Sequence, residues 1–179
     1  MPYLVIGARA MLFVIFVASF TGKARSRAAF TAFADSLAGF GLRGTRLQAR
    51  TAGIVIAAEG AAAVLIALPF TAIWGLAAGG LIITVFTAKA AMARRQGLRP
   101  VCNCFGFSKS ALGARHIMRN GLIIAVAMAG LLAELASGRT HLGVAPVVLA
   151  TGIAVIAGTG IVVWDDLAAL LGPPQGSRP

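Results

Sequence analysis

Five long apolar segments alternate with polar connections along the chain. They run over about residues 3–20, 51–68, 70–92, 117–135 and 144–164. Each segment approaches the roughly 20 apolar residues that an α-helix needs to cross the hydrocarbon core of a bilayer. Lipid offers the backbone no hydrogen-bond partners, so such segments are expected to be helical. The pattern predicts an all-α membrane protein: a bundle of about five transmembrane helices over residues 1–171, followed by a disordered tail over residues 172–179.

The first long polar connection, residues 21–50, contains a shorter helical pattern. Its apolar side chains recur at helical spacing: Phe30, Phe33, Leu37 and Phe40. We expect a short amphipathic helix on the membrane surface here, ended by Gly39 and Gly41. Gly39, Gly41 and Gly44 match the spacing of a dinucleotide-binding fingerprint, but no strand or crossover unit surrounds them, which excludes that interpretation.

The composition agrees with a membrane protein and gives it an orientation. Hydrophobic residues make up 59% of the chain and charged residues 12%, against about 25% charged in a soluble domain. A net charge of +11 would suggest nucleic-acid binding in a soluble protein, but here the basic residues lie between the apolar segments. The expected partner is therefore the lipid bilayer and not nucleic acid. The basic connections 21–50 and 93–115 lie on one side, which the positive-inside rule places in the cytoplasm together with the C-terminus, in a multi-pass protein of the cell membrane.

Both cysteines of the chain lie in the second basic connection, as Cys102 and Cys104. Two cysteines at this spacing can close a small strained disulfide ring, which is reduced more easily than a structural disulfide. Neighbouring basic residues favour the reactive thiolate: Arg99, Lys109 and Arg115. Asn103 can donate a hydrogen bond without adding charge, and Gly106 helps to define the geometry of the loop. The sequence therefore predicts a redox-active pair formed by Cys102 and Cys104.

Two alternatives for the cysteine pair remain open. Soft thiolates suit Cu(I), and His116 and Met118 are nearby candidates for a third ligand. No second C-x-C motif accompanies the pair, and a tetrahedral zinc site is not available within one chain, so we predict no metal site. The other alternative is that the cysteines carry no chemistry. The protein would then be a non-enzymatic membrane scaffold or assembly subunit.

Two charged residues lie inside predicted spans, Arg9 in the first and Glu59 in the second. A buried charge in a membrane is costly and usually faces the interior of the bundle. At about 1.5 Å per residue, the difference in depth is within reach of two long side chains. We therefore predict an intramembrane pair between Arg9 and Glu59. The alternative is a protonated Glu59 that is hydrogen-bonded to a neighbouring helix.

Two further features concern how the helices pack. Gly75 and Gly79 form a G-x-x-x-G pair, which predicts a close approach of another helix. Arg119 and Asn120 lie where the fourth span enters the membrane, one or two turns after the cysteines. We expect Asn120 to tie the cysteine loop to the bundle. For Arg119 the alternative is a side chain that extends to the lipid headgroups.

These residues together resemble the methylamine utilisation protein MauE family, within the wider DoxX-like group. The resemblance rests on Cys102-x-Cys104-Phe105-Gly106 followed by Arg119-Asn120 at the start of an apolar helix. Supporting features are Gly22-Lys23, the stretch from Phe30 to Leu42 and Glu59, so that the resemblance covers about residues 5–135. The family usually has glycine between the cysteines, where this chain has Asn103.

The resemblance implies a DoxX-like four-helix core plus a C-terminal helix. It also implies a role in the maturation of methylamine dehydrogenase, whose disulfide-rich small subunit lies outside the cytoplasm, beside a thioredoxin-like partner. We expect thiol–disulfide exchange that supports disulfide formation in a partner protein, with a quinone as a reasonable electron acceptor. The charge rule, however, places the cysteines inside. Either the pair passes electrons across the membrane, or the loop is reached from the other side.

Overall fold

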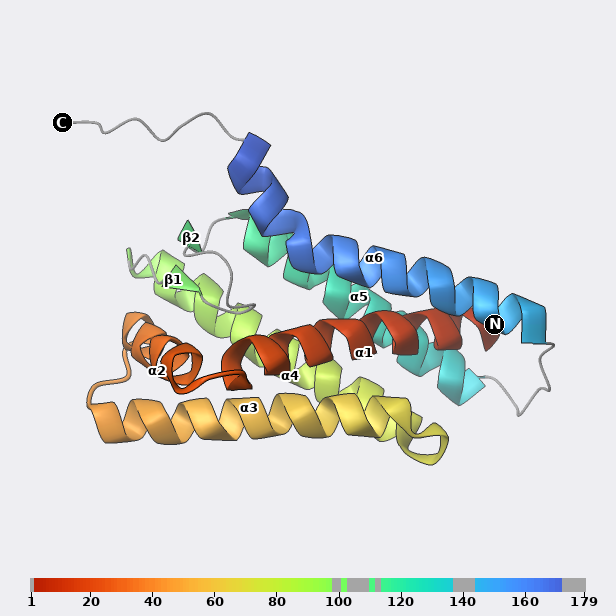
Figure 1. The fold of residues 1–179 in the computed structure, drawn as a ribbon, viewed down its shortest axis with the longest axis horizontal. Helices are drawn as coiled ribbons and strands as arrows, with labels where there is room; N and C mark the ends of the chain where they lie inside the picture. Colours follow the sequence, from red (N-terminus) through yellow and green to blue (C-terminus); the bar gives the residue numbers. More distant parts are fainter. Residues whose placement is uncertain (1, 98–100, 103–109, 112–113, 137–143, 172–179) are drawn as a thin grey trace.

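The computed structural model describes residues 2–97, 101–102, 110–111, 114–136 and 144–171, and the predicted tail at 172–179 lies outside them. The elements in chain order are α1 (Pro2–Ala24), α2 (Arg27–Ser36), η1 (Leu37–Phe40), α3 (Thr45–Ala67), η2 (Pro69–Thr71), α4 (Ala72–Arg95), β1 (Val101–Cys102), β2 (Ser110–Ala111), α5 (Ala114–Ala136) and α6 (Val144–Leu171) (Figure 1). Five helical segments are long and apolar enough to cross a membrane. The prediction of an all-α membrane protein is confirmed.

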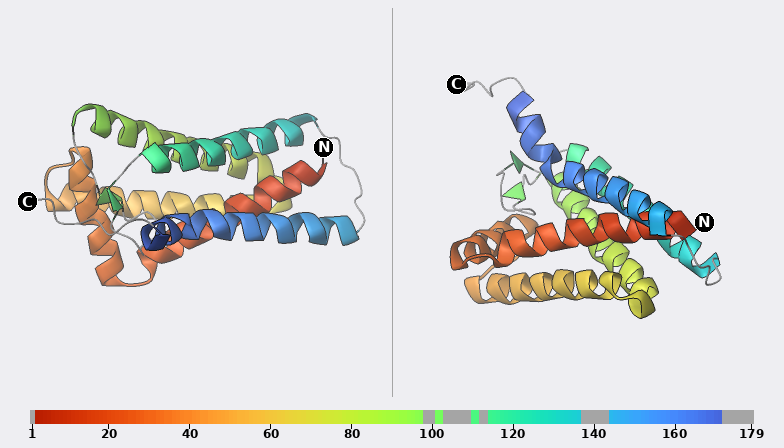
Figure 2. Two further views of the ribbon diagram at one scale, coloured as in Figure 1. Left: turned by 90° about the horizontal axis from the view of Figure 1, so that it is seen from above. Right: turned by 45° about the vertical axis from the view of Figure 1, so that its right-hand side comes forward.

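The helix α1 lies at the centre of the bundle. It packs against α3, α5 and α6, while α4 packs against α3 and α5 (Figures 1 and 2). The largest fully buried side chains belong to the core of this arrangement: Leu12, Ile66, Leu76 and Ile123. The helices α1, α3, α4 and α5 therefore form a four-helix core, and α6 is added beside α1.

The two glycines of the G-x-x-x-G pair allow the close approach that their spacing predicts. A Cβ atom on Gly75 would lie 2.5 Å from the backbone nitrogen of Ile66 in α3. A Cβ atom on Gly79 would lie 2.7 Å from the Cε2 atom of Phe16 in α1. Real Cβ atoms do not come so close to other heavy atoms, so a side chain at Gly75 would force α4 away from the backbone of α3, and one at Gly79 would displace the ring of Phe16.

The predicted amphipathic helix is present as α2, continued by η1. Ser26 caps its start, because its Oγ accepts a hydrogen bond of 3.1 Å from the backbone nitrogen of Ala29. Gly41 ends η1 in the left-handed conformation, with φ of 85°. The apolar face differs from the expectation in one respect. Phe33 and Leu37 are buried against α3 and so do not lie free for lipid.

Several helices begin or end beyond the apolar segments that define the predicted spans. The helix α3 starts at Thr45 and α1 continues to Ala24, so both include polar residues. Hydropathy detects only the part of a helix that suits hydrocarbon, whereas backbone hydrogen bonds extend the helix into the polar region. This extension places Lys23 on a helix, where the apolar pattern predicts a connection.

One end of the bundle contains the start of the cysteine segment. It contains α2, β1 and β2, the end of α1 and the start of α3 (Figure 1). Exposed basic side chains surround it: Arg25, Arg27, Arg43, Arg46, Arg50, Arg94 and Arg95. We call it the basic end.

Candidate functional site at the basic end

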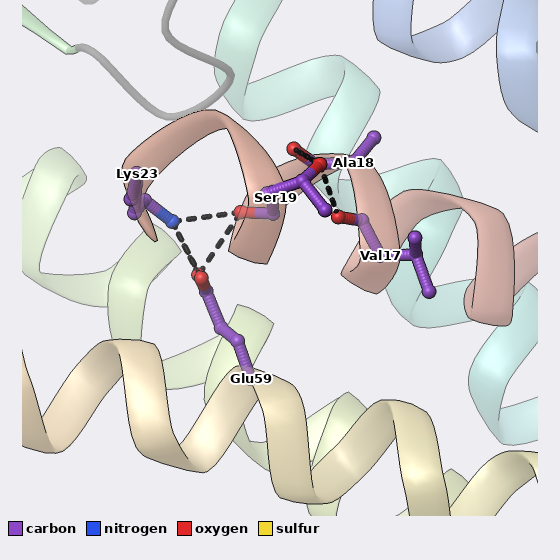
Figure 3. A network of polar contacts seen from close by, with 6 residues as sticks. Val17, Ala18, Ser19, Lys23 and Glu59 are labelled. Carbon is purple, nitrogen blue, oxygen red and sulfur yellow. Dashed lines mark hydrogen bonds and ion pairs between the residues drawn. The ribbon is translucent and has the colours of Figure 1, made fainter. Parts of the chain in front are cut away.

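A closed network of three polar side chains joins α1 to α3 inside the bundle (Figure 3). The Nζ atom of Lys23 lies 2.5 Å from Oε1 and 2.7 Å from Oε2 of Glu59. Lys23 also donates to Ser19 Oγ at 2.7 Å, and the hydroxyl of Ser19 donates to Glu59 Oε1 at 3.0 Å. The side chains of Lys23 and Glu59 are only 3% and 9% exposed. The network is therefore an ion pair buried from water, and the hydroxyl of Ser19 is hydrogen-bonded to both of its members.

The local structure explains why these side chains meet. Ser19 and Lys23 are four residues apart on α1, so they lie on the same face of the helix. Glu59 follows Ala52 and Ile56 on the buried face of α3. The ammonium of Lys23 also lies 4.8 Å from the ring centroid of Phe33 in α2, in a cation–π contact. The network therefore links three helices, α1, α2 and α3.

The predicted pair between Arg9 and Glu59 is wrong. Arg9 donates from Nε and Nη2 to the carbonyl oxygen of Ile66 at 3.1 and 2.9 Å, and from Nη2 to that of Ala67 at 3.2 Å. These carbonyls belong to the last turn of α3, where they have no partner within the helix and where a cation is favoured. Ile66 lies about 10 Å further along α3 than Glu59, so Arg9 reaches a different level of the bundle.

The alternative prediction for Glu59 is met in part. The expected hydrogen bond from a neighbouring helix is present, from Ser19 of α1. The Lys23 side chain accompanies it and donates to both carboxyl oxygens, a contact that the alternative did not include. Lys23 and Ser19 are the two residues that the sequence analysis missed. The signal that could have identified them is their spacing of four residues at the end of the first apolar segment, which places both side chains on one face of a helix.

The cysteine segment begins in a short antiparallel pairing. In β1 and β2, Val101 pairs with Ala111 and Cys102 pairs with Ser110. The structure describes the backbone at Cys102, whereas Asn103, Cys104, Phe105 and Gly106 lie outside the described residues. The redox activity of the pair therefore stays a prediction. The strand β1 contacts α2, so the start of the cysteine segment is placed beside the helix that Lys23 supports.

The two helices that flank the cysteine segment are joined by Asn120. Its Nδ2 atom donates to Thr87 Oγ1 at 3.1 Å, which links α5 to α4. The side chain of Asn120 is buried, and that of Arg119 is half-buried. The bond joins the helix that precedes β1 to the helix that follows β2, whereas the predicted tie to the cysteine loop stays a prediction, because residues 103–109 lie outside the described residues.

The alternative of a metal site concerns Cys102 and Cys104, and Cys104 lies outside the described residues. Among them there is no group of three His, Cys, Asp or Glu side chains that could hold an ion. The side chain of His116 is 8% exposed and that of Met118 is 77% exposed. Residues two apart on a helix do not face each other, so the two candidate third ligands point in different directions.

Comparisons with known proteins agree with the sequence resemblance. The family model of the methylamine utilisation protein MauE matches residues 1–133. The matched region contains the Lys23–Glu59 pair, both cysteines and Asn120, and it ends before α6. No match was found among curated proteins or among solved structures. Because the family model covers most of the sequence, including the four-helix core, this chain belongs to the methylamine utilisation protein MauE family.

Proposed function

We propose that this MauE-family membrane protein performs thiol–disulfide exchange through Cys102 and Cys104, and so supports disulfide formation in a partner protein. The observation that carries the proposal is the pairing of Cys102 with Ser110. This pairing brings together the two ends of the segment that contains Cys104. It supports the proposal because residues 102 and 110, which lie on either side of Cys104 in the chain, are held close in space.

The proposed reaction consists of two exchange steps. A thiolate of the partner attacks the Cys102–Cys104 disulfide and forms a mixed disulfide. The second thiolate of the partner then attacks the mixed disulfide, so that the partner gains a disulfide and Cys102 and Cys104 become thiols. Reoxidation of the pair releases two electrons and two protons, which pass either to a quinone or to the disulfide of a thioredoxin-like protein.

The charges at the basic end suit this chemistry. Arg27 at the start of α2, and Arg94 and Arg95 at the end of α4, are exposed near the chain segments that lead to the cysteines. Positive charge favours the thiolate over the thiol, and the thiolate is the attacking species. The same charges support the proposal that this end faces the cytoplasm of a cell-membrane protein.

The family suggests where the reaction is used. The printed description is methylamine utilisation, which supports a role in methylamine metabolism. We propose the maturation of methylamine dehydrogenase as the use of this activity. The partner protein is then the small subunit of that enzyme or a thioredoxin-like intermediate.

The proposal is tested by trapping the thiols with an alkylating reagent and weighing the protein. The wild-type protein from oxidising conditions should carry a Cys102–Cys104 disulfide that a dithiol reductant opens. The double variant Cys102→Ser/Cys104→Ser should lose partner oxidation in cells. If the disulfide never forms and the double variant oxidises its partner normally, the protein is a scaffold or assembly subunit.

Two further measurements separate the alternatives. Copper bound to the purified protein in a one-to-one ratio, and lost in the Cys102→Ser/Cys104→Ser variant, would favour the Cu(I) hypothesis over exchange. A membrane-impermeant thiol reagent applied to intact cells reports on which side of the membrane Cys102 and Cys104 lie. Labelling in intact cells would place the cysteines outside, whereas labelling only after lysis would place them in the cytoplasm.

A further inference from the structure

We propose that Lys23 and Glu59 are positioning residues for the cysteine segment and that they act through α2. The inference rests on the proposed function, because it assigns to the buried ion pair a role in thiol–disulfide exchange. It says that the pair fixes the place of α2, and that α2 in turn fixes the backbone of β1, which contains Cys102. Three observations carry it.

The first observation is that the ion pair forms part of the surface on which α2 rests. Lys23 contacts the ring of Phe33, and Phe33 is 3% exposed. The remaining contacts of Phe33 include the cluster formed with Ala52 and Ile56 of α3, which precede Glu59 on the same buried face. A shift of Lys23 would therefore move the surface beneath α2.

The second observation is that α2 depends on this support. It has only 10 residues, and isolated helices shorter than about 12–15 residues are marginal in water. Its N-terminal cap at Ser26 and its apolar face are the interactions that hold it. We therefore expect the position of α2 to follow changes in the contact between Lys23 and Phe33.

The third observation is that β1 has little support of its own. The pairing of β1 with β2 involves two residues in each strand. Even a complete two-stranded hairpin is marginally stable at best in water. Because β1 contacts α2, that helix supplies a support for the backbone at Cys102.

An ion pair is suited to this role because its attraction and hydrogen bonds are favourable only when the two helices have one relative position. Apolar side chains can slide past each other on two helices with little change in energy. A lysine that meets both carboxyl oxygens and a hydroxyl has a defined register, and buried polar groups are known to specify register at a cost in stability. Lys23 and Glu59 would thus fix α1 against α3 at the level of α2.

The test compares variants that keep the fold but lose the interactions that fix the position of α1 and α2 against α3. Lys23→Met/Glu59→Met removes both charges and leaves no unpaired buried ion, so it is expected to fold. Phe33→Leu removes the ring that contacts Lys23 and keeps the ion pair, while Phe33→Tyr keeps the ring. Arg9→Gln is the matched control, because it removes a charge from α1 at the opposite end of the bundle.

The measurement is the alkylation rate of Cys102 as a function of pH, in full-length protein whose Cys104 is replaced by Ser. The double variant and Phe33→Leu should each shift this profile, while Phe33→Tyr and Arg9→Gln should match the parent. The exchange rate of the intact pair should fall by about 10- to 100-fold in the same two variants, since small misplacements of reacting groups have effects of this size.

The outcomes separate this inference from the proposed function. Folded variants with the parental alkylation profile would overturn the positioning role, even if the wild type exchanges disulfides. A shifted profile in a protein whose wild type never exchanges disulfides would sustain the positioning role and reject the proposed function. If the double variant does not fold, Phe33→Leu alone decides the question.

Discussion

Removing only one member of the Lys23–Glu59 pair should destabilise the protein strongly. In Glu59→Met, the ammonium of Lys23 loses the contacts at 2.5 and 2.7 Å to both carboxyl oxygens and retains Ser19 Oγ and the ring of Phe33. Its side chain is 3% exposed, so water does not replace the carboxylate. Breaking a buried pair in this way typically costs about 3–5 kcal/mol.

A loss of about 3 kcal/mol, at the lower end of this range, is about 150-fold in the unfolding equilibrium at about 1.4 kcal/mol per factor of ten. The double variant Lys23→Met/Glu59→Met leaves no charge behind and should lose much less. A double-mutant cycle should therefore give a coupling energy of about 2 kcal/mol or more. The free energy of unfolding is measured by titrating detergent-solubilised protein with sodium dodecyl sulfate and following helical circular dichroism.

A control uses ionic strength. Salt screens exposed charges and affects buried pairs much less, so the coupling energy should be nearly the same at low and high salt. A loss below about 1 kcal/mol in Glu59→Met is the size expected of an exposed ion pair, and it would refute the assignment of this pair as buried.

Four other changes test the packing of the bundle, the first three by the same unfolding titration. Gly75→Ala should destabilise by about 1–3 kcal/mol, because its Cβ would overlap the backbone of α3, whereas Gly53→Ala meets nothing within 4 Å and should be neutral or stabilising. Arg9→Leu should cost about 1–3 kcal/mol, since the part-buried carbonyl of Ile66 and the exposed carbonyl of Ala67 lose a charged donor. Asn120→Leu should cost about 0.6–1.7 kcal/mol through the lost bond between α5 and α4, and an unchanged stability would show that this bond contributes nothing. Ser26→Ala should destabilise α2 by about 0.5–2 kcal/mol, seen as faster hydrogen exchange in α2 alone.

The pattern of apolar residues predicted much of the fold, because the bilayer requires each spanning segment to be long, apolar and helical. Length and hydropathy predicted the five helical segments that the structure has, and the glycine spacing predicted a close approach. The spacing of the phenylalanines predicted α2 for the same reason, since an apolar face must be covered. These are properties of one segment at a time, so they can be read without knowing which segments are neighbours.

The pairing of charges could not be read in this way. Glu59 and Arg9 were predicted to pair because both lie within apolar segments. Lys23 lies outside those segments, in a basic connection, and so was assigned to the charges that orient the protein in the membrane. Lys23 turned out to lie in the last turn of α1 and to point back to Glu59. Arg9 instead donates to a carbonyl oxygen in the last turn of α3. Every helix leaves such carbonyls without a partner, and no sequence pattern shows which side chain will bind them.

The sequence by itself determined that this chain is a membrane bundle, where its spans lie, that it resembles the MauE family, and which two thiols are candidates for chemistry. Only the tertiary structure decided that Lys23 partners Glu59, that α2 covers the pair, and that β1 rests on α2. Hydropathy acts on each helix separately, because every apolar segment gains by leaving water. Partners among polar side chains depend on the rotation and depth of one helix against another, and those are decided by the packing of the whole bundle.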